Sequence, residues 1–377
     1  MPALRTVGML ASPHLTALCL VAAFVVVLAG TLAMGGGDLH YAQTRFFKSF
    51  VVWWSPAHDL HLPVLPGAYT IGALLLANLV ARQVTSFAVR GISVGALMIH
   101  SGVGLLLLGQ LVADQMSERS ALRLTRGLPA NYAEDLLAQE LVIADRDGPV
   151  VTVPESVLER KGEVHHQPSQ LTIRVKEFWP NAGLSVRPVP GARRISVTRG
   201  TTRNTAYILP RPVVEDAETG NAPAAVIEVL TPSSSLGAWI LSTRLRGTQR
   251  FAHQNREFEI ALGARRRYRP FSITLLDARR DLHHGTDVAR SIWSRVRIQN
   301  PASRDEREVV VAVNKPFRYQ GETYYQSQVD AAGERSTLQV VRNPGWAMPY
   351  ISCALVGFGL LVQLTAPLKG LARKGSL

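Results

Sequence analysis

His100 is the side chain best placed to do chemistry within the apolar stretches of this sequence. It lies in Gly91–Ala113 (GISVGALMIHSGVGLLLLGQLVA), which contains no Asp, Glu, Lys or Arg and is long enough to cross a bilayer as a helix. Because His100 is close to the middle of this stretch, we expect its imidazole near the midplane of the membrane. An ionisable group at that depth is costly, and by default it marks a functional site with a partner.

Small residues surround His100 on the expected helix. Ala96 and Gly104 lie one turn away on either side, so they leave space for a flat, bulky group to reach a ring nitrogen. The alternative is structural, a neutral imidazole that hydrogen-bonds to a Ser, an Asn or a carbonyl group of another helix. Glycines recur every seven residues on roughly the opposite face, where a neighbouring helix can pack closely: Gly95, Gly102 and Gly109.

Other histidines offer weaker sites. His40, His58 and His61 lie in the loop that follows the first apolar segment. On the outer surface they could hold a metal or cap a haem, although histidines in surface loops are more often simply polar. The pairs His165–His166 and His283–His284 are adjacent, so on a strand their side chains point to opposite faces and do not chelate one ion.

The sequence contains no catalytic motif in a suitable context. Gly91–Gly95 matches the Gly-x-Ser-x-Gly pattern, but that motif needs a strand before the Ser, whereas here it opens an apolar segment. No phosphate-binding glycine loop and no zinc-spaced cluster occurs. Cys19 and Cys353 both fall in apolar segments, so there is no disulfide framework and no Cys-x-x-Cys motif. We therefore assign no catalytic residue and expect neither a thiol oxidoreductase nor a c-type cytochrome.

Apolar segments organise the chain. We expect four transmembrane helices, which are Leu15–Gly35, Leu62–Ala81, Gly91–Ala113 and Ala347–Leu368. The first is expected to be an uncleaved anchor, because its apolar run is longer than a typical signal-peptide core. Residues 1–113 then form a membrane domain with three helices, and residues 347–377 add the fourth helix and a basic tail.

Positive charges predict the orientation of these helices. Both termini and the turn between the second and third helices are expected to be cytoplasmic, because basic residues lie there: Arg5, Arg82, Arg90, Lys369, Arg373 and Lys374. The loop after the first helix and residues 114–346 are then expected on the outer side.

Residues 41–54, in the first outer loop, have a helical period. Aromatic residues such as Phe46, Phe50 and Trp53 share one face, while Arg45 and Lys48 lie on the other. We expect an amphipathic helix that lies in the membrane interface, with its basic side toward the lipid headgroups.

Residues 114–346 are expected to form an outer, mainly antiparallel all-β domain of the sandwich or barrel type. Residues 117–139 are mixed and suggest helix or coil, and residues 140–153 suggest a hairpin around Asp147–Gly148. Period-2 runs or apolar runs that predict strands follow, at 171–176, 194–198, 224–230, 238–242, 256–262, 272–276, 292–298, 308–314 and 337–341. The turn residues between them are spaced as in sandwiches and barrels.

The net charge of the 377-residue chain is +13. Because the outer region is basic without a long Lys/Arg run, a solvated basic surface is a better explanation than nucleic-acid binding. We expect no nucleic-acid partner.

Several local phrases resemble the ResB (CcsB-type) family of cytochrome c biogenesis proteins. In the apolar segments they are Gly30–Leu32, Asn78 near the end of the second segment, Met98–Gly102 around His100, and Gly357 and Gly359 in the last segment. In the outer region they are Val313–Pro316, Tyr319–Gly321, Tyr324–Gln326 and Asn343–Trp346. The resemblance covers both ends of the chain and little of the region from Arg146 to Gly263.

The resemblance implies a subunit of a cytochrome c maturation (system II) complex in a bacterial inner membrane, with its large domain on the periplasmic side. With a CcsA-type membrane protein it would carry haem b across the bilayer and present it to apocytochrome c, while a thioredoxin-like reductant acts indirectly. His100 matches the family's transmembrane histidine, a proposed axial haem ligand, and neutral imidazole is a standard axial ligand for haem iron. The basic outer domain, or Arg45 and Lys48, could receive the haem propionates. The tryptophan-rich haem segment of the partner is not recognisable here, so the chain would be one half of the complex and not a fusion. It would be at most a non-catalytic or accessory subunit, because the sequence shows no acid, base or nucleophile in a recognisable arrangement.

Two rival interpretations differ in class. The chain could instead be a membrane-anchored β-domain scaffold or chaperone that holds apocytochrome or the partner subunit and binds no haem itself. A third interpretation is a ligand sensor. It is set aside because the expected cytoplasmic ends are too short to contain an output domain.

Overall fold

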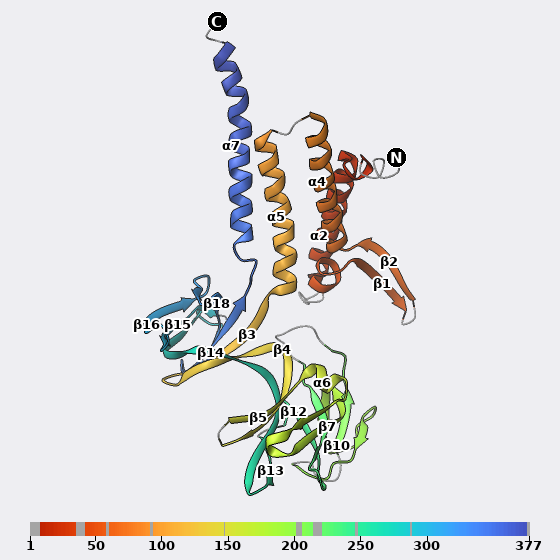
Figure 1. Cartoon of the computed structure of the whole chain (residues 1–377), viewed down its shortest axis with the longest axis vertical. Coiled ribbons are helices and arrows are strands. Elements are labelled where there is room, and N and C mark those ends of the chain that lie inside the picture. Colours follow the sequence, from red (N-terminus) through yellow and green to blue (C-terminus); the bar gives the residue numbers. More distant parts are fainter. Residues whose placement is uncertain are drawn as a thin grey trace. The chain divides into compact units, whose positions relative to one another are not determined.

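A computed structural model describes residues 8–34, 42–57, 60–90, 93–146, 148–200, 206–213, 221–245, 248–286 and 289–374. The chain divides into two compact units (Figure 1). The helical unit consists of Met1–Ser117 and Asn343–Leu377, and the β unit of Glu118–Arg342. The sequence predicts the corresponding boundaries four residues away, between residues 113 and 114 and between residues 346 and 347.

Among its described residues, the helical unit contains four long helices, a short π-helical turn and a hairpin. Their bounds are α2 Pro13–Met34, η1 Gln43–Phe47, β1 Val51–Ala57, β2 Leu60–Pro66, α4 Ala68–Arg90, α5 Val94–Met116 and α7 Met348–Lys374. Among the described residues, three helices are long and apolar enough to cross a membrane: Pro13–Met34, Val94–Met116 and Met348–Thr365. A membrane protein with a β domain is therefore plausible. The second expected span, Leu62–Ala81, has no counterpart among these three helices.

Two expectations about the segment before α4 are wrong. Residues 41–54 do not form one amphipathic helix, because the π-helical turn η1 is followed by strand β1, which pairs antiparallel with β2. The second apolar segment also begins as strand, and its helix is shifted toward the C-terminus, from Ala68 to Arg90. Val51–Trp54 is rich in β-forming residue types, and its pairing with Leu62–Pro66 overrides the helical period of the aromatic residues.

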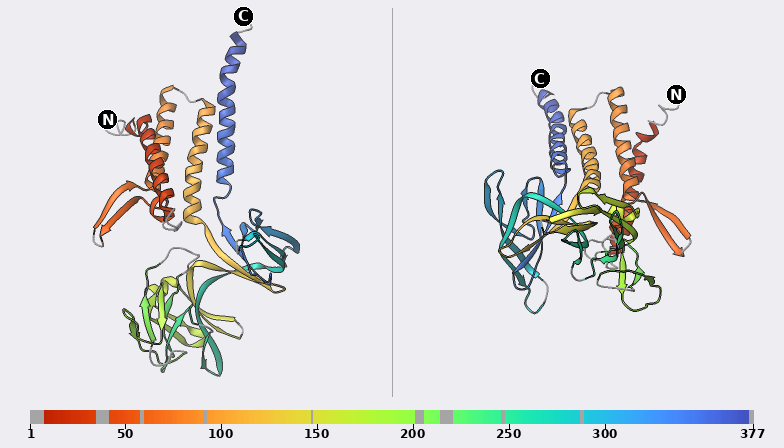
Figure 2. Two further views of the ribbon diagram at one scale, coloured as in Figure 1. Left: turned by 180° about the vertical axis from the view of Figure 1, so that it is seen from behind. Right: turned by 60° about the horizontal axis from the view of Figure 1, so that its bottom comes forward.

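The row of glycines on α5 packs against α7, as its seven-residue spacing predicts. A Cβ atom added to Gly95 would lie 2.7 Å from the carbonyl oxygen of Gly359, and one on Gly109 would lie 2.8 Å from Cβ of Met348. All three views show α5 and α7 side by side (Figures 1 and 2). Small residues at such an interface let two helix backbones approach closely.

Asn78 joins α4 to the start of the chain. Its side chain is buried, its Oδ1 accepts a hydrogen bond of 2.7 Å from Thr16 Oγ1 of α2, and its Nδ2 donates to the Leu10 and Ser12 carbonyl oxygens at 2.5 and 3.0 Å. Cys19, Val26 and Ile71 form a small core between the same two helices. An amide with all these partners satisfied fixes α4 against α2.

The β unit is almost entirely strand. It contains one short helix, α6 Glu155–Glu159, and a 3₁₀ turn at Gln167–Ser169. The strands are β3 Glu118–Thr125, β4 Pro129–Asp145, β5 Gly148–Pro154, β6 Glu163–His166, β7 Leu171–Trp179, β8 Ala182–Ser185, β9 Arg193–Ile195, β10 Ala206–Pro210, β11 Ala224–Leu230, β12 Ser235–Ser242, β13 Gln249–His253, β14 Arg256–Leu282, β15 Ala289–Asn300, β16 Asp305–Ala312, β17 Phe317–Tyr319, β18 Glu322–Val329 and β19 Arg335–Arg342. The expected all-β architecture is therefore present.

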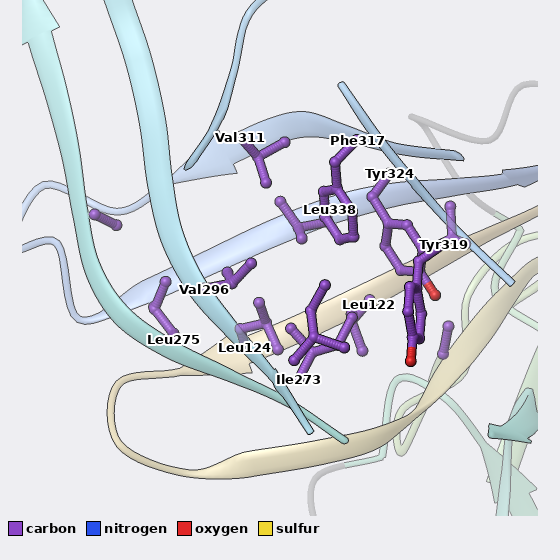
Figure 3. Packing of buried hydrophobic residues seen from close by; sticks show 14 of the residues in the cluster. Leu122, Leu124, Ile273, Leu275, Val296, Val311, Phe317, Tyr319, Tyr324 and Leu338 are labelled. Atoms are coloured by element: carbon purple, nitrogen blue, oxygen red, sulfur yellow. The ribbon is translucent and has the colours of Figure 1, made fainter. Parts of the chain in front are cut away.

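The long strands β4 and β14 both contribute residues to two separate cores of this unit. The largest sheet has the order β16-β15-β14-β4-β3-β19-β18-β17, and β4 and β14 are its longest strands. The first core packs residues from both halves of that sheet, including Leu122, Ile273 and Tyr324 (Figure 3). The second core lies between β5-β4-β14 and the four-stranded sheet β12-β11-β7-β6, and it contains Trp239 and Phe258. The strand ladders are antiparallel.

Some local expectations for the β unit hold and others do not. Strand β11 covers the predicted residues 224–230, and β4 and β5 pair around residue 147 as a hairpin. Residues 117–139, expected as helix or coil, instead form β3 and much of β4. The two strands expected at 256–262 and 272–276 are one continuous strand, β14.

Candidate functional site

His100 lies in the first third of α5. The helix begins at Val94, where the side chain of Ser93 caps it by accepting a hydrogen bond of 3.2 Å from the Ala96 amide. Ser93 Oγ also donates to Gln363 Oε1 of α7 at 2.9 Å, so the start of α5 is fixed to the opposite helix. His100 is thus about five residues, or about 7 Å, before the helix centre. The helix starts and ends later than the apolar segment, so His100 is nearer to its N-terminal end than to its centre.

The imidazole of His100 makes no hydrogen bond with the residues that the structure describes. Its Nδ1 atom is buried and has no partner. The structural alternative needs a bond from this ring to a Ser, an Asn or a carbonyl group of another helix, and no such bond is present in the described part of the chain. Buried polar groups are normally satisfied, so an orphan nitrogen calls for an explanation such as a missing ligand.

The space expected beside Gly104 is filled by α4. A Cβ atom on Gly104 would lie 3.3 Å from Leu79 Cδ2 and 3.8 Å from Leu76 Cδ1. Gly104 is therefore a close-packing position between α4 and α5, and the helix pair leaves no slot for a flat ligand there. Ala96, the other expected neighbour, is half-buried.

His100 lies between two partly exposed apolar side chains of α5. Leu97 and Val103, three residues before and after it, are 40% and 38% exposed. Residues at this spacing are neighbours on a helix surface, so the ring lies between two exposed apolar side chains. A further group could reach the imidazole between these two side chains.

The three loop histidines cannot be placed as ligands. His40 and His58 lie outside the described residues, and His61 is in β2 with its side chain undescribed. In the part of the chain that the structure describes, no group of three or more His, Cys, Asp or Glu side chains could hold a metal ion.

The two cations expected to face headgroups or propionates have partners within the helical unit. Lys48 Nζ is 2.6 Å from Asp114 Oδ1, near the end of α5, and the guanidinium of Arg45 donates to the Trp53 carbonyl oxygen. Lys48 and Arg45 therefore position the turn η1 and the hairpin. An anionic ligand would have to compete with these contacts.

A network of charged side chains in the β unit was not predicted from the sequence. Asp135 is buried and accepts hydrogen bonds of 2.9 Å from both Arg265 and Arg267, and Arg267 also donates to Glu118. The hydrogen bond from Arg267 holds the pKa of Glu118 below its usual value. Further along β14, Arg269 pairs with Glu322. The only sequence signal was the arginine-rich stretch Arg265–Arg269, which Tyr268 interrupts and whose partners are distant in sequence.

The phrases that resemble the ResB family in the β unit have structural roles. Gln320 and Gly321 both have positive φ, 50° and 78°, which fits the two-residue turn that joins β17 to β18. Tyr324 is fully buried in the first core and stacks on Phe317 with ring centroids 4.5 Å apart. Burial and the nearby Glu322 carboxylate raise the pKa of the Tyr324 phenol. These residues shape the β unit.

The last of these phrases, Asn343–Trp346, leads into α7. The side chain of Asn343 accepts a hydrogen bond of 2.8 Å from the Gly345 amide, and the Met348 amide bonds to the Gly345 carbonyl oxygen at 3.0 Å. The phrase therefore forms the turn that starts the helix. No protein-family model matches this chain, and no curated protein matches it significantly.

Proposed function

We propose that this chain is a multi-pass membrane subunit of a cytochrome c maturation complex. In this proposal it works with a CcsA-type partner to move haem b across a bacterial inner membrane and to present it to apocytochrome c, and a thioredoxin-like protein supplies reductant separately. Haem is the cargo, and the chain itself provides no nucleophile, acid or base.

The observation that carries the proposal is the unpartnered imidazole of His100. An ionisable side chain in an apolar helix is expected to have a partner, and Nδ1 has none among the described residues. In this proposal, a haem iron held by the partner subunit approaches the ring between Leu97 and Val103, and one ring nitrogen of His100 binds it. The other nitrogen would then be free to hydrogen-bond to the partner, as second-shell contacts to metal-bound histidines usually do.

The proposal includes α4 as a fourth transmembrane helix. It packs against α2 through Asn78 and Thr16, and against α5 through Leu79 and Gly104. A helix of 23 residues that lies against two apolar helices long enough to span would have to cross the same bilayer. The basic ends of the helices orient the β unit toward the periplasm under the positive-inside rule.

One observation favours the scaffold alternative. The filled space at Gly104 means that this chain alone has no slot between α4 and α5 for haem, so the chain could hold the partner without touching its cargo. In the scaffold interpretation, the exposed face of α5 is simply the contact surface for another helix.

Co-purification distinguishes the haem-transport proposal from the scaffold alternative. The chain and its partner are purified together from haem-replete cells, and the Soret band is recorded for the wild type and for His100→Gln. A Soret band that weakens at least about tenfold, with unchanged recovery of both subunits, supports ligation by His100. An unchanged band in the variant, or a haem-free complex that still matures cytochromes, supports the scaffold.

A further inference from the structure

A pocket of about 580 Å³ lies between the edges of β12 and β13 in the β unit. Its lining includes Trp239 from β12, Phe251 and Ala252 from β13, and Arg199 and Gly200 from the segment that follows β9. None of these residues belongs to the helical unit or to the proposed haem path.

The aromatic floor of this pocket contains an unsatisfied donor. Trp239 is 1% exposed, its ring lies 5.5 Å from that of Phe251, and its Nε1 has no hydrogen-bond partner among the described residues. A Cβ atom on Gly200 would lie 3.1 Å from Trp239 Cδ1, the carbon bonded to that nitrogen. The indole N–H is therefore next to a residue that has no side chain and a φ of +88°.

Strand β13 presents an open edge to the pocket. Among the described strands it pairs with β14 alone, through a two-residue turn in which Gln254 and Asn255 have φ of 51° and 57°. In such a hairpin the pairs next to the turn and every second pair beyond it are hydrogen-bonded. The N–H and C=O groups of Arg250 and Ala252 therefore point away from β14, and no backbone partner for them occurs among the described residues.

The facing edge of β12 is closed. The Thr198 and Arg199 amides donate to the Ala238 carbonyl oxygen at 3.1 and 3.0 Å, and Gln249 Nε2 donates to the Ile240 carbonyl oxygen at 2.6 Å. An added strand could thus pair with β13 and not with β12. Unprotected edges are where another chain adds by β-augmentation.

A positively charged side chain beside the edge of β13 favours a ligand that carries an acidic group. Arg199 donates through Nε to the Leu236 carbonyl oxygen at 3.3 Å and has no carboxylate partner in the described part of the chain. Arg250 is paired with Glu259 at 2.6 Å. Among the described residues that line the pocket, Arg199 is therefore a cation available to a ligand carboxylate.

We propose that this groove binds an extended, unfolded polypeptide segment of a client protein. The segment adds as a strand to the edge of β13 at Arg250 and Ala252, places an apolar side chain against Phe251 and Trp239, and brings an acidic side chain to Arg199. Backbone pairing gives affinity for many sequences, and the pocket selects among them. The proposal stands without the haem role, although an apocytochrome would be such a client.

The test uses the full chain in detergent and a fluorescein-labelled peptide of about twelve residues that alternates Thr and Val around one Phe and two Asp. Two further peptides carry backbone N-methyl groups, one at the odd and one at the even positions. Because an added strand bonds through alternate amides, one methylated peptide should lose about tenfold or more in affinity and the other should bind nearly as well as the parent. Fluorescence anisotropy measures all three.

Protein variants address the same edge. Ala252→Pro removes the outward N–H without touching the ladder to β14, and it should weaken binding about tenfold or more, while Ala252→Ser should bind within about twofold of the wild type. Arg199→Gln should weaken binding and reduce its salt dependence.

Equal affinity of both methylated peptides would overturn the proposal, as would wild-type binding by Ala252→Pro or no binding of the parent peptide. Equally effective competition by N-acetyl-Phe-Asp would also contradict it and indicate a small anionic ligand. The N-methyl comparison needs no variant protein, so a misfolded Ala252→Pro leaves the test intact. Because none of these measurements involves haem, their failure is distinct from failure of the proposed function.

Discussion

A Cβ atom on Gly102 of α5 would lie 2.9 Å from the carbonyl oxygen of Ser352 in α7, and 2.7 Å from Cγ2 of Val356. Both distances are shorter than contacts that real side chains make, so α5 and α7 touch through a position where only hydrogen fits. This contact fixes the helix that carries His100.

Gly102→Leu should therefore destabilise the helical unit. Overpacking at a tight contact typically costs about 1–3 kcal/mol, and the helices would have to move apart. Gly357→Leu is the matched control, because nothing lies within 4 Å of a Cβ atom there. Thermal unfolding of the full chain in detergent should show a lower midpoint for Gly102→Leu alone. Equal midpoints for both variants would show that α5 and α7 do not pack through Gly102.

The ion pair between Arg269 and Glu322 predicts a large loss when one partner is removed. The side chain of Arg269 is only 6% exposed, and it bonds to both oxygens of Glu322, at 2.6 and 3.1 Å. Because Glu322→Gln leaves a buried guanidinium without its counter-charge, we expect a loss of about 3–5 kcal/mol in the free energy of unfolding. The double variant Arg269→Met with Glu322→Leu should lose less, because no buried charge remains.

An exposed ion pair in the same unit provides the control. Arg297 and Glu308 are 2.8 Å apart with side chains 41% and 47% exposed, so Glu308→Gln should change the unfolding free energy far less than Glu322→Gln does. Denaturant unfolding followed by tryptophan fluorescence measures all of these variants. Similar losses for Glu322→Gln and Glu308→Gln would contradict the role given to burial.

The pKa of Glu118 predicts a pH dependence of stability. The hydrogen bond from Arg267 lowers the pKa of Glu118 in the folded chain below its ordinary value of 4.5. A carboxyl group with a lowered folded pKa contributes stability that is present above the unfolded pKa and is lost as pH falls through the folded pKa. Glu118→Gln should therefore reduce the stability difference between neutral pH and pH below about 4.

Glu155 should behave in the opposite way. Burial raises its pKa, so its contribution is present at low pH and is lost as pH rises through the folded value. Glu155→Gln should thus steepen the loss of stability on acidification where Glu118→Gln makes it shallower. The same pH slope in both variants would show that the Arg267 contact does not govern Glu118.

The proposed orientation predicts the behaviour of reporter fusions. A fusion after Arg90, where α4 ends, should report a cytoplasmic location, and one after Gly285, in the turn that follows β14, should report a periplasmic one. A cytoplasmic signal from the fusion after Gly285 would reverse the topology and remove the route to periplasmic apocytochrome.

Features with a strict period could be predicted from the sequence. The seven-residue glycine spacing of Gly95, Gly102 and Gly109 depends on the geometry of one helix, and it correctly indicated a close helix contact. The alternation in Leu171–Lys176 likewise indicated β7, whose inward residues Leu171, Ile173 and Val175 are buried.

Features that depend on distant partners could not be predicted. The period of the aromatic residues before Trp54 fitted a helix, but pairing of Trp54 with Leu62 decided for a hairpin. The polar side chains of residues 265–269 made the sequence predict a break between two strands. In the structure, Asp135 and Glu322 form ion pairs with arginines of this stretch, and β14 continues through it. The packing of Leu79 against Gly104 is likewise a tertiary contact that small residues on α5 could not reveal.

The most direct test of the central claim compares His100→Ala with His100→Gln in the complex with its partner. If His100 ligates the iron of the transported haem, both variants should lose most of the bound haem and of the cytochrome c yield at normal protein level, because an amide is a poor axial ligand. Added imidazole should restore part of the function of His100→Ala, and His14→Gln, at the exposed start of α2, should behave as wild type. Normal haem content and normal cytochrome yield in His100→Gln would contradict the account.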